Sequence, residues 1–81
     1  MEFDKDKVDK MALALMYLTT FEEKISGIDY YRTWKGFDWD ILNRLYEKGY
    51  ISNPVGKAKS VSFTEEGSKL SEELFKEFFC K

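Results

Sequence analysis

Carboxylates are the side chains whose type and spacing come nearest to a catalytic pattern in this sequence. Asp38 and Asp40 stand two residues apart, and Glu47 follows in the same segment. Such groups can support catalysis by carboxylates alone or hold a magnesium ion. Because Asp38 and Asp40 precede a helical pattern, a cap and a favourable charge at the positive end of the helix dipole explain them better. We therefore expect no catalytic residue and no metal site.

The residue types that carry most other protein chemistry are scarce. There is no histidine, which supplies most general bases near neutral pH and most zinc, copper and iron sites. The one cysteine, Cys80, excludes an intramolecular disulfide and a thiolate cluster, and it fits a reducing compartment. These observations favour a non-enzymatic binding protein without a cofactor or a small-molecule substrate.

Positive charge is concentrated in the middle third of the chain. The formal net charge is -2, which gives no general attraction to nucleic acid or membranes. The segment from Arg32 to Lys59, however, contains six basic and three acidic residues, and the segments on both sides of it are acidic. The middle third is therefore a modest cationic island.

Size and composition predict one soluble domain that covers residues 1–81. A chain of 81 residues can bury one core but not two, and 43% hydrophobic with 35% charged residues suits a folded chain. The longest apolar stretch, Met11 to Leu18, is far shorter than the roughly 20 residues that a membrane span needs. The first residues lack the features of a secretory signal, so we expect the protein in the cytoplasm.

The first half of the chain predicts a helix, an aromatic connection and the start of a second helix. Apolar residues at three-and-four spacing favour a helix from about Lys5 to Lys24, apolar nearly all round its middle. From Ile25 to Phe37 the pattern breaks, and we expect a connection with at most one or two helical turns. The next helix begins at the Asp38 cap and ends at Gly49, because glycine readily adopts the left-handed conformation.

The second half predicts a β-hairpin and a last helix. Tyr50–Ser52 and Ser60–Phe63 have the composition of two short strands, joined by a basic, mobile tip. Thr64 then caps a last helix that runs close to the C-terminus, with acidic residues in its first turn. The predicted fold is therefore α+β and mainly helical, in the order helix, short aromatic connection, helix, two-stranded hairpin, helix.

Two segments of the second half resemble winged helix-turn-helix regulators. Residues 42–51, LNRLYEKGYI, resemble the end of a recognition helix and the first strand of a wing. Residues 63–67, FTEEG, are similar to the junction where the second wing strand enters the following helix. Together they span Asp38 to about Leu74, nearly half of the chain, in the right order. The resemblance implies a winged-helix-like domain.

A second resemblance covers almost the whole chain. The strings TWKGFDWD (residues 33–40), KAKSV (57–61) and MALAL (11–15) are similar to a family of small bacterial proteins classed as a domain of unknown function. This resemblance implies a bacterial origin and brings no established activity with it.

The winged-helix resemblance implies binding to double-stranded DNA in transcriptional control. The second helix would lie in the major groove, and the hairpin tip would touch phosphates or the minor groove. Asn43 would then pair with adenine and Arg44 with guanine. The other basic side chains of the island would neutralise phosphates: Arg32, Lys35, Lys48, Lys57 and Lys59. Taken singly, each of these residues is explained more simply as a solvated surface position.

Three features count against DNA. Asp38 and Asp40 would repel phosphate from the start of the reading helix. The helix that usually precedes a recognition helix is replaced by the aromatic connection, and the cationic excess is small. A winged scaffold does not by itself establish DNA binding.

The alternative is a protein-interaction module without DNA binding, most simply a homodimer. Burying further apolar surface would benefit a chain whose lone core supplies only about 3 to 5 kcal/mol of net stability. A dimer through the first and last helices would cover Met11, Leu15, Phe75, Phe78 and Phe79. Docking of the last helix onto the first helix of the same chain explains these phenylalanines equally well.

Overall fold

The computed structural model describes residues 1–81. Its first helix, α1 (Lys5–Leu18), begins where the sequence predicts and ends earlier than predicted. The hydroxyls of Thr19 and Thr20 donate hydrogen bonds of 3.3 and 3.0 Å to the backbone carbonyl of Met16. Such bonds satisfy carbonyls that the last helical turn leaves without an intrahelical partner. The prediction that this helix continues to Lys24 is therefore wrong.

The segment predicted as an aromatic connection, Ile25–Phe37, mostly belongs to a β-hairpin. β1 (Phe21–Ile25) pairs antiparallel with β2 (Ile28–Trp34) through the two-residue turn Ser26–Gly27. Both turn residues have positive φ angles, 52° and 80°. Two-residue turns of this kind match the twist of paired strands, and the flanking β-branched and aromatic residues favour strand over helix. The prediction of helical turns in this segment is wrong for that reason.

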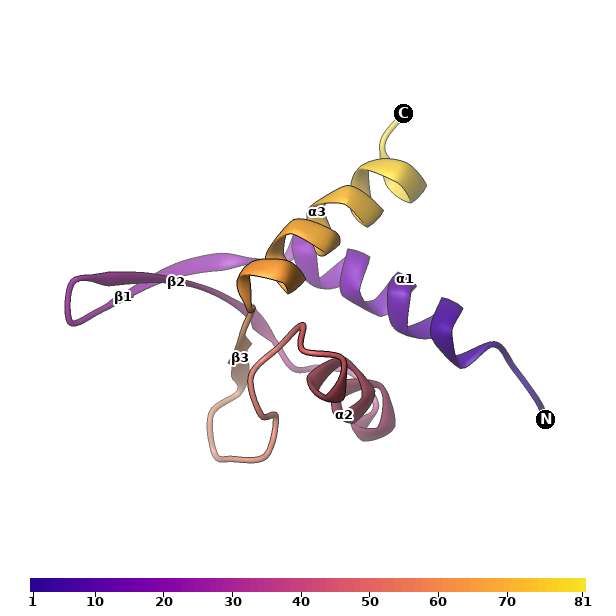
Figure 1. Ribbon diagram of the computed structural model, residues 1–81, viewed down its shortest axis with the longest axis horizontal. Coiled ribbons are helices and arrows are strands. Elements are labelled where there is room, and N and C mark those ends of the chain that lie inside the picture. Colours follow the sequence, from indigo (N-terminus) through magenta and orange to yellow (C-terminus); the bar gives the residue numbers. More distant parts are fainter.

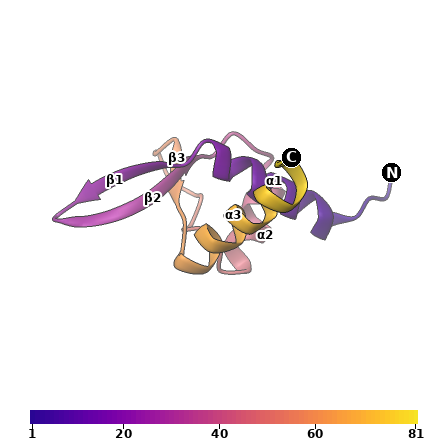
Figure 2. The same cartoon turned by 90° about the horizontal axis from the view of Figure 1, so that it is seen from above.

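A third strand, β3 (Ser60–Ser62), completes an antiparallel sheet in the order β1-β2-β3. Arg32 lies opposite Ser62, and Trp34 lies opposite Ser60. The β1–β2 hairpin extends away from the three helices (Figure 1), and the view turned by 90° shows the same arm at one end of the molecule (Figure 2). Only the base of the hairpin therefore packs on the body of the protein.

The second helix, α2 (Trp39–Glu47), has the ends that the sequence predicts. The Asp38 carboxylate accepts a hydrogen bond of 3.2 Å from a backbone N–H of the first turn. At the other end Gly49 has a φ angle of 82°, and the N–H of Tyr50 donates to the carbonyl of Leu45 at 3.0 Å. This closure is typical of a helix that ends at a glycine.

The predicted hairpin over residues 50–63 is present only in part. Its first strand, Tyr50–Ser52, is reduced to a single bridge between Ile51 and Phe63. Its second strand is β3, whose ladder partner is β2. Pro54 has no N–H to donate to a ladder, which keeps the following loop from pairing.

The last helix, α3 (Glu65–Phe79), begins at the predicted cap, because the Thr64 hydroxyl oxygen accepts a hydrogen bond of 3.0 Å from the N–H of Gly67. α1 packs against both α3 and α2, as Figure 1 shows. The core between these elements and the sheet consists of Leu13, Ala14, Met16, Leu42, Leu45, Ile51, Val61 and Leu74. None of the helices combines the length and the apolar character that crossing a membrane requires.

Candidate interaction surfaces

Two basic residues that were predicted to bind DNA, Arg44 on α2 and Lys48 at its C-cap, are held by acids of α1. Arg44 donates through Nε and Nη2 to the two carboxylate oxygens of Asp9, at 2.7 and 2.8 Å. Lys48 Nζ donates to Asp6 at 3.1 Å and to Asp9 at 3.3 Å. The Asp9 side chain is only 1% exposed, so this cluster lies in the contact between the two helices.

The electrostatics of the cluster favour its charged form. Burial by itself raises the pKa of the Asp9 carboxyl, but the hydrogen bonds and positive charges of Arg44 and Lys48 outweigh burial and hold that pKa below its usual value. The hydrogen bond to Asp9 raises the pKa of Arg44. Desolvation lowers the pKa of Lys48, but its bonds to Asp6 and Asp9 raise it further than that. The cluster is therefore a link between α1 and α2.

Arg32, predicted to contact phosphate, connects β2 to β3. Its Nε and Nη1 atoms donate to the hydroxyls of Ser60 and Ser62, at 2.9 and 2.8 Å. Its Nη2 atom donates to the carbonyl of Ser60 at 3.0 Å. The guanidinium therefore binds neutral oxygens and meets no carboxylate of the chain.

The other predicted DNA contacts lie near one loop or stand free on α2. Lys35 Nζ donates to two backbone carbonyls in the loop of residues 53–59, at 2.7 and 3.1 Å. Lys57 and Lys59 are exposed on that loop and form no ion pair. Asn43 is exposed on α2. The structure thus brings Lys35 beside Lys57 and Lys59, while Arg44 on α2 and Lys48 at its C-cap face α1.

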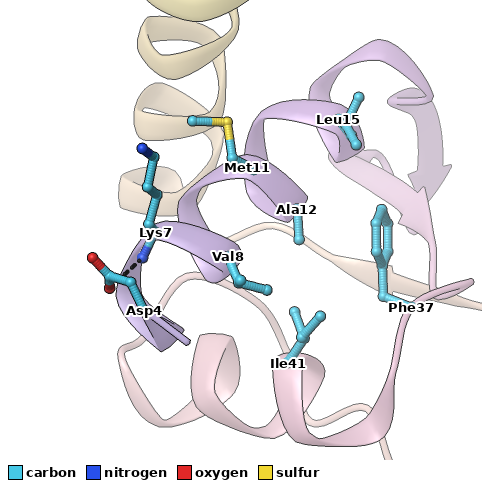
Figure 3. A pocket seen from close by; sticks show the side chains of 8 residues that line it. All are labelled: Asp4, Lys7, Val8, Met11, Ala12, Leu15, Phe37 and Ile41. Carbon is cyan, nitrogen blue, oxygen red and sulfur yellow. Dashed lines mark hydrogen bonds between the residues drawn. The ribbon is translucent and has the colours of Figure 1, made fainter. Parts of the chain in front are cut away.

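An apolar groove of about 460 Å³ lies between α1 and α2 (Figure 3). Six apolar residues line it: Val8, Met11, Ala12, Leu15, Phe37 and Ile41. Figure 3 shows Val8 and Ala12 pointing towards Ile41. At one end the Asp4 carboxylate accepts a hydrogen bond of 3.0 Å from the N–H of Lys7. Two residues predicted for a dimer interface, at positions 11 and 15, thus line a groove of the single chain.

The phenylalanines predicted for the same interface divide into two groups. Phe75 packs on α1, with 5.3 Å between its ring centroid and that of Tyr17, and it also contacts Phe79 at 5.6 Å. Phe78 and Phe79 remain 43% and 44% exposed near the end of α3. Packing within the chain therefore covers Phe75 and leaves the Phe78 and Phe79 rings partly exposed.

The two faces of the sheet differ in a way that the sequence-based prediction missed. Thr33 and Val61 lie opposite each other on β2 and β3, and both are buried on the core side. Because successive side chains of a strand point to opposite faces, their neighbours along the strands point away from the core. We call this surface the outer face. On β1 and β2 it carries Phe21, Glu23, Ile25, Ile28, Tyr30, Arg32 and Trp34.

Most of the outer face is apolar and accessible. Ile28 is 57% exposed and Trp34 is 53% exposed. The Phe21 and Trp34 rings pack together at the base of the hairpin, with centroids 4.9 Å apart. The opposite side of the hairpin carries three charged residues and one tyrosine: Glu22, Lys24, Asp29 and Tyr31. An antiparallel sheet that covers a core usually has the reverse pattern, with polar residues outside. Alternation on both sides of Ser26–Gly27 is the signal that reveals this face in the sequence.

The fold and these surfaces define a small α+β domain that exposes apolar residues on its sheet and between two helices. The chain belongs to the family described as "Domain of unknown function (DUF6429)", which it matches over residues 4–81. It is similar to a protein named "Uncharacterized protein y4hR" of Sinorhizobium fredii (strain NBRC 101917 / NGR234), with 46% identity over 81 residues that cover the whole of both chains. No solved structure matches the chain. The predicted likeness to a family of unknown function is confirmed.

Proposed function

We propose that this protein is a non-enzymatic interaction module that acts in the cytoplasm and binds another protein molecule through the outer face. The observation that carries the proposal is the direction of the apolar residues on β1 and β2, which point away from the core. An exposed apolar patch with a polar surround is typical of protein interaction sites.

The composition of the outer face suits such a role. Trp34, Tyr30 and Arg32 belong to residue types that are enriched where proteins bind one another. Contact with Phe21 restrains Trp34 before any partner arrives, which lowers the entropy lost on binding. Because a two-stranded hairpin is only marginally stable in water, a partner that covers the arm would also stabilise it.

Site-specific photo-crosslinking in bacterial cells tests this proposal. A photo-reactive residue in place of Ile28 lies on the outer face, and one in place of Asp29 lies on the opposite side of the same strand. We expect protein adducts from position 28 and few from position 29. Equal yields at the two positions, or none at position 28, would argue against an interface on the outer face.

DNA binding by a surface of winged-helix type is the second candidate function. It is favoured by Lys57 and Lys59, which are exposed without ion pairs on the loop between Ile51 and β3, where a wing tip would lie. It is disfavoured at α2, because Arg44 would have to release the buried carboxylate of Asp9 before reaching a base. The balance of these contacts supports the protein-interaction role.

A labelled pool of DNA duplexes separates the two candidates. A DNA-binding role requires an affinity that falls steeply between about 50 and 200 mM salt. It also requires that Lys57→Ala combined with Lys59→Ala weakens that affinity. We expect no salt-sensitive binding. Arg44→Ala is the poorer test, because it also removes the link between α1 and α2.

A further inference from the structure

We infer that the partner of the outer face is a second copy of this chain, packed face to face across a two-fold axis. The inference rests on the function proposed above and names the partner. A two-fold interface must be self-complementary, because each copy contributes the same patch. The outer face meets this requirement with its charges, its apolar residues and its area.

The charges of the outer face match their own copy. Glu23 and Arg32 are its acid and its base, and neither forms an ion pair within the chain. Arg32 donates three hydrogen bonds to serine oxygens and keeps two of its five N–H groups for another acceptor. When the two hairpins lie antiparallel, Arg32 of each copy lies level with Glu23 of the other, one strand to the side, so these two long side chains can pair. An apolar partner would leave both unpaired, which is costly.

Apolar residues flank this charged pair on both sides. Ile25 and Ile28 lie opposite each other next to the turn, and Phe21 packs on Trp34 at the base. When two such hairpins lie antiparallel, the tip of one covers the base of the other. Ile28 then packs on Trp34 of the second copy, and the same contact forms again at the other end.

The solvent-accessible surface area of the single chain is larger than its mass predicts. A compact monomer of 9.6 kDa has an accessible surface of about 5,100 Å². This chain exposes 5844 Å², and both the β1–β2 arm and the exposed residues 1–4 extend from a molecule of 44 × 32 × 18 Å. The excess of about 700 Å² is close to the roughly 800 Å² per partner that a standard interface buries. Covering the arm by a second copy removes part of this excess.

Other contacts between copies suit a two-fold axis less well. The free edge of β1 carries Glu22, Glu23 and Lys24, and charged residues are a feature by which natural edge strands avoid pairing. Face-to-face packing of the outer faces does not require these charged edges to pair.

Sedimentation of the purified full chain tests the inference. We expect twice the chain mass at micromolar concentration. Ile28→Asp and Glu23→Arg should each raise the dissociation constant by at least about 30-fold, the size of a hot-spot loss, because each change occurs twice in a two-fold interface. The matched control is Glu22→Arg, which changes the neighbouring acid on the opposite side of the strand and should leave the mass unchanged.

Mixing two variants separates a broken interface from a damaged fold. The Glu23→Arg variant carries two basic residues on its outer face, and the Arg32→Glu variant carries two acidic residues on its outer face. Each variant alone should be monomeric, whereas an equal mixture should sediment as a heterodimer. Loss of the serine contacts of Arg32 would not be repaired by mixing, so restoration of the dimer supports the reciprocal pair.

Two results would overturn the inference. One is a wild-type chain that stays monomeric throughout the micromolar range, and the other is a dimer that Ile28→Asp and Glu23→Arg leave intact. In the first case, adducts between position 28 and a different protein would still support the interaction module. A monomeric chain that also gives no adduct at position 28 would contradict both the dimer and the interaction module.

Discussion

Arg44 on α2 binds Asp9 on α1, 35 residues earlier in the chain, through two parallel hydrogen bonds of 2.7 and 2.8 Å. The carboxylate is buried, and a buried charge without a partner is costly. The arginine that resembles a base-reading residue in the sequence therefore contributes to helix packing. In the structure, Arg44 neutralises the buried Asp9 carboxylate, so that α1 can place an acid in its contact with α2.

Asp9→Asn should lower the free energy of unfolding by about 1 to 3 kcal/mol, because the charged acceptor of two cations is lost. Chemical denaturation near neutral pH measures the change. Asp6→Asn is the matched control, since the Asp6 side chain is 79% exposed and binds only Lys48. We expect little change in the control. Equal losses for the two variants would contradict a special role for the buried carboxylate.

The same carboxylate predicts how stability depends on pH. The pKa of Asp9 lies below its usual value of 3.8 in the folded chain, so the unfolded chain binds the proton more tightly. The stabilisation by Asp9 is therefore complete above 3.8 and is lost as the pH falls through the lower pKa of the folded state. Denaturation at about pH 7 and about pH 3 should show the gap between wild type and Asp9→Asn narrowing in acid. A gap that stays constant would contradict this assignment.

Local signals in the sequence predicted the ends of two helices correctly. Asp38, Gly49 and Thr64 each act within a few residues of their own position, as caps or terminators. Such signals are visible in the sequence because the hydrogen bonds that they make are short in range. The order of α2, β3 and α3 followed from them.

The same local reasoning could not predict features that depend on residues far apart in the sequence. The apolar spacing of α1 continues past its end into Phe21, so the helical pattern concealed the start of β1. The pair between Arg44 and Asp9 has no local signal, because the partner is chosen by how two helices meet. Alternation around Ser26–Gly27 separates the two sides of the hairpin, but which side faces the core depends on the long-range packing of Thr33.

The two segments that resemble a winged helix-turn-helix meet in space. The Thr64 hydroxyl donates to the carbonyl of Gly49 at 2.6 Å, and the Thr64 N–H donates to the carbonyl of Tyr50 at 3.0 Å. Gly67, in the first turn of α3, lies so close to Tyr50 that a side chain there would overlap its backbone. The resemblance therefore rests on residues that join α3 to the end of α2. It reflects this structural junction and does not depend on what the protein binds.

Gly67→Ala should destabilise the chain by about 1 to 3 kcal/mol, because the added methyl group forces the first turn of α3 away from the Tyr50 backbone. Thermal or chemical unfolding measures the loss. Gly36→Ala is the matched control, since a methyl group at Gly36 meets nothing within 4 Å. We expect a near-neutral effect there. If Gly67→Ala were as mild as the control, the close approach of α3 to residue 50 would not hold in solution.

Thr33→Val should loosen the base of the hairpin without changing the outer face. The Thr33 hydroxyl is fully buried, donates to the carbonyl of Met16 at 3.0 Å and lies 2.9 Å from the Thr19 hydroxyl. Valine keeps the shape but removes these bonds, at a cost of about 0.5 to 1.5 kcal/mol.

Hydrogen exchange of the backbone amides measures this change. Amides of β1 and β2 should exchange faster in Thr33→Val, whereas those of α3 should change less. Thr20→Val is the control, because its hydroxyl binds the same Met16 carbonyl at 3.0 Å from outside the strands. Since Thr33 points to the core and Ile28 points away from it, Thr33→Val should weaken the hairpin's attachment while leaving the contact residues of the outer face in place. A variant that exchanges faster and still sediments at twice the chain mass would separate the anchoring of the arm from its use as an interface.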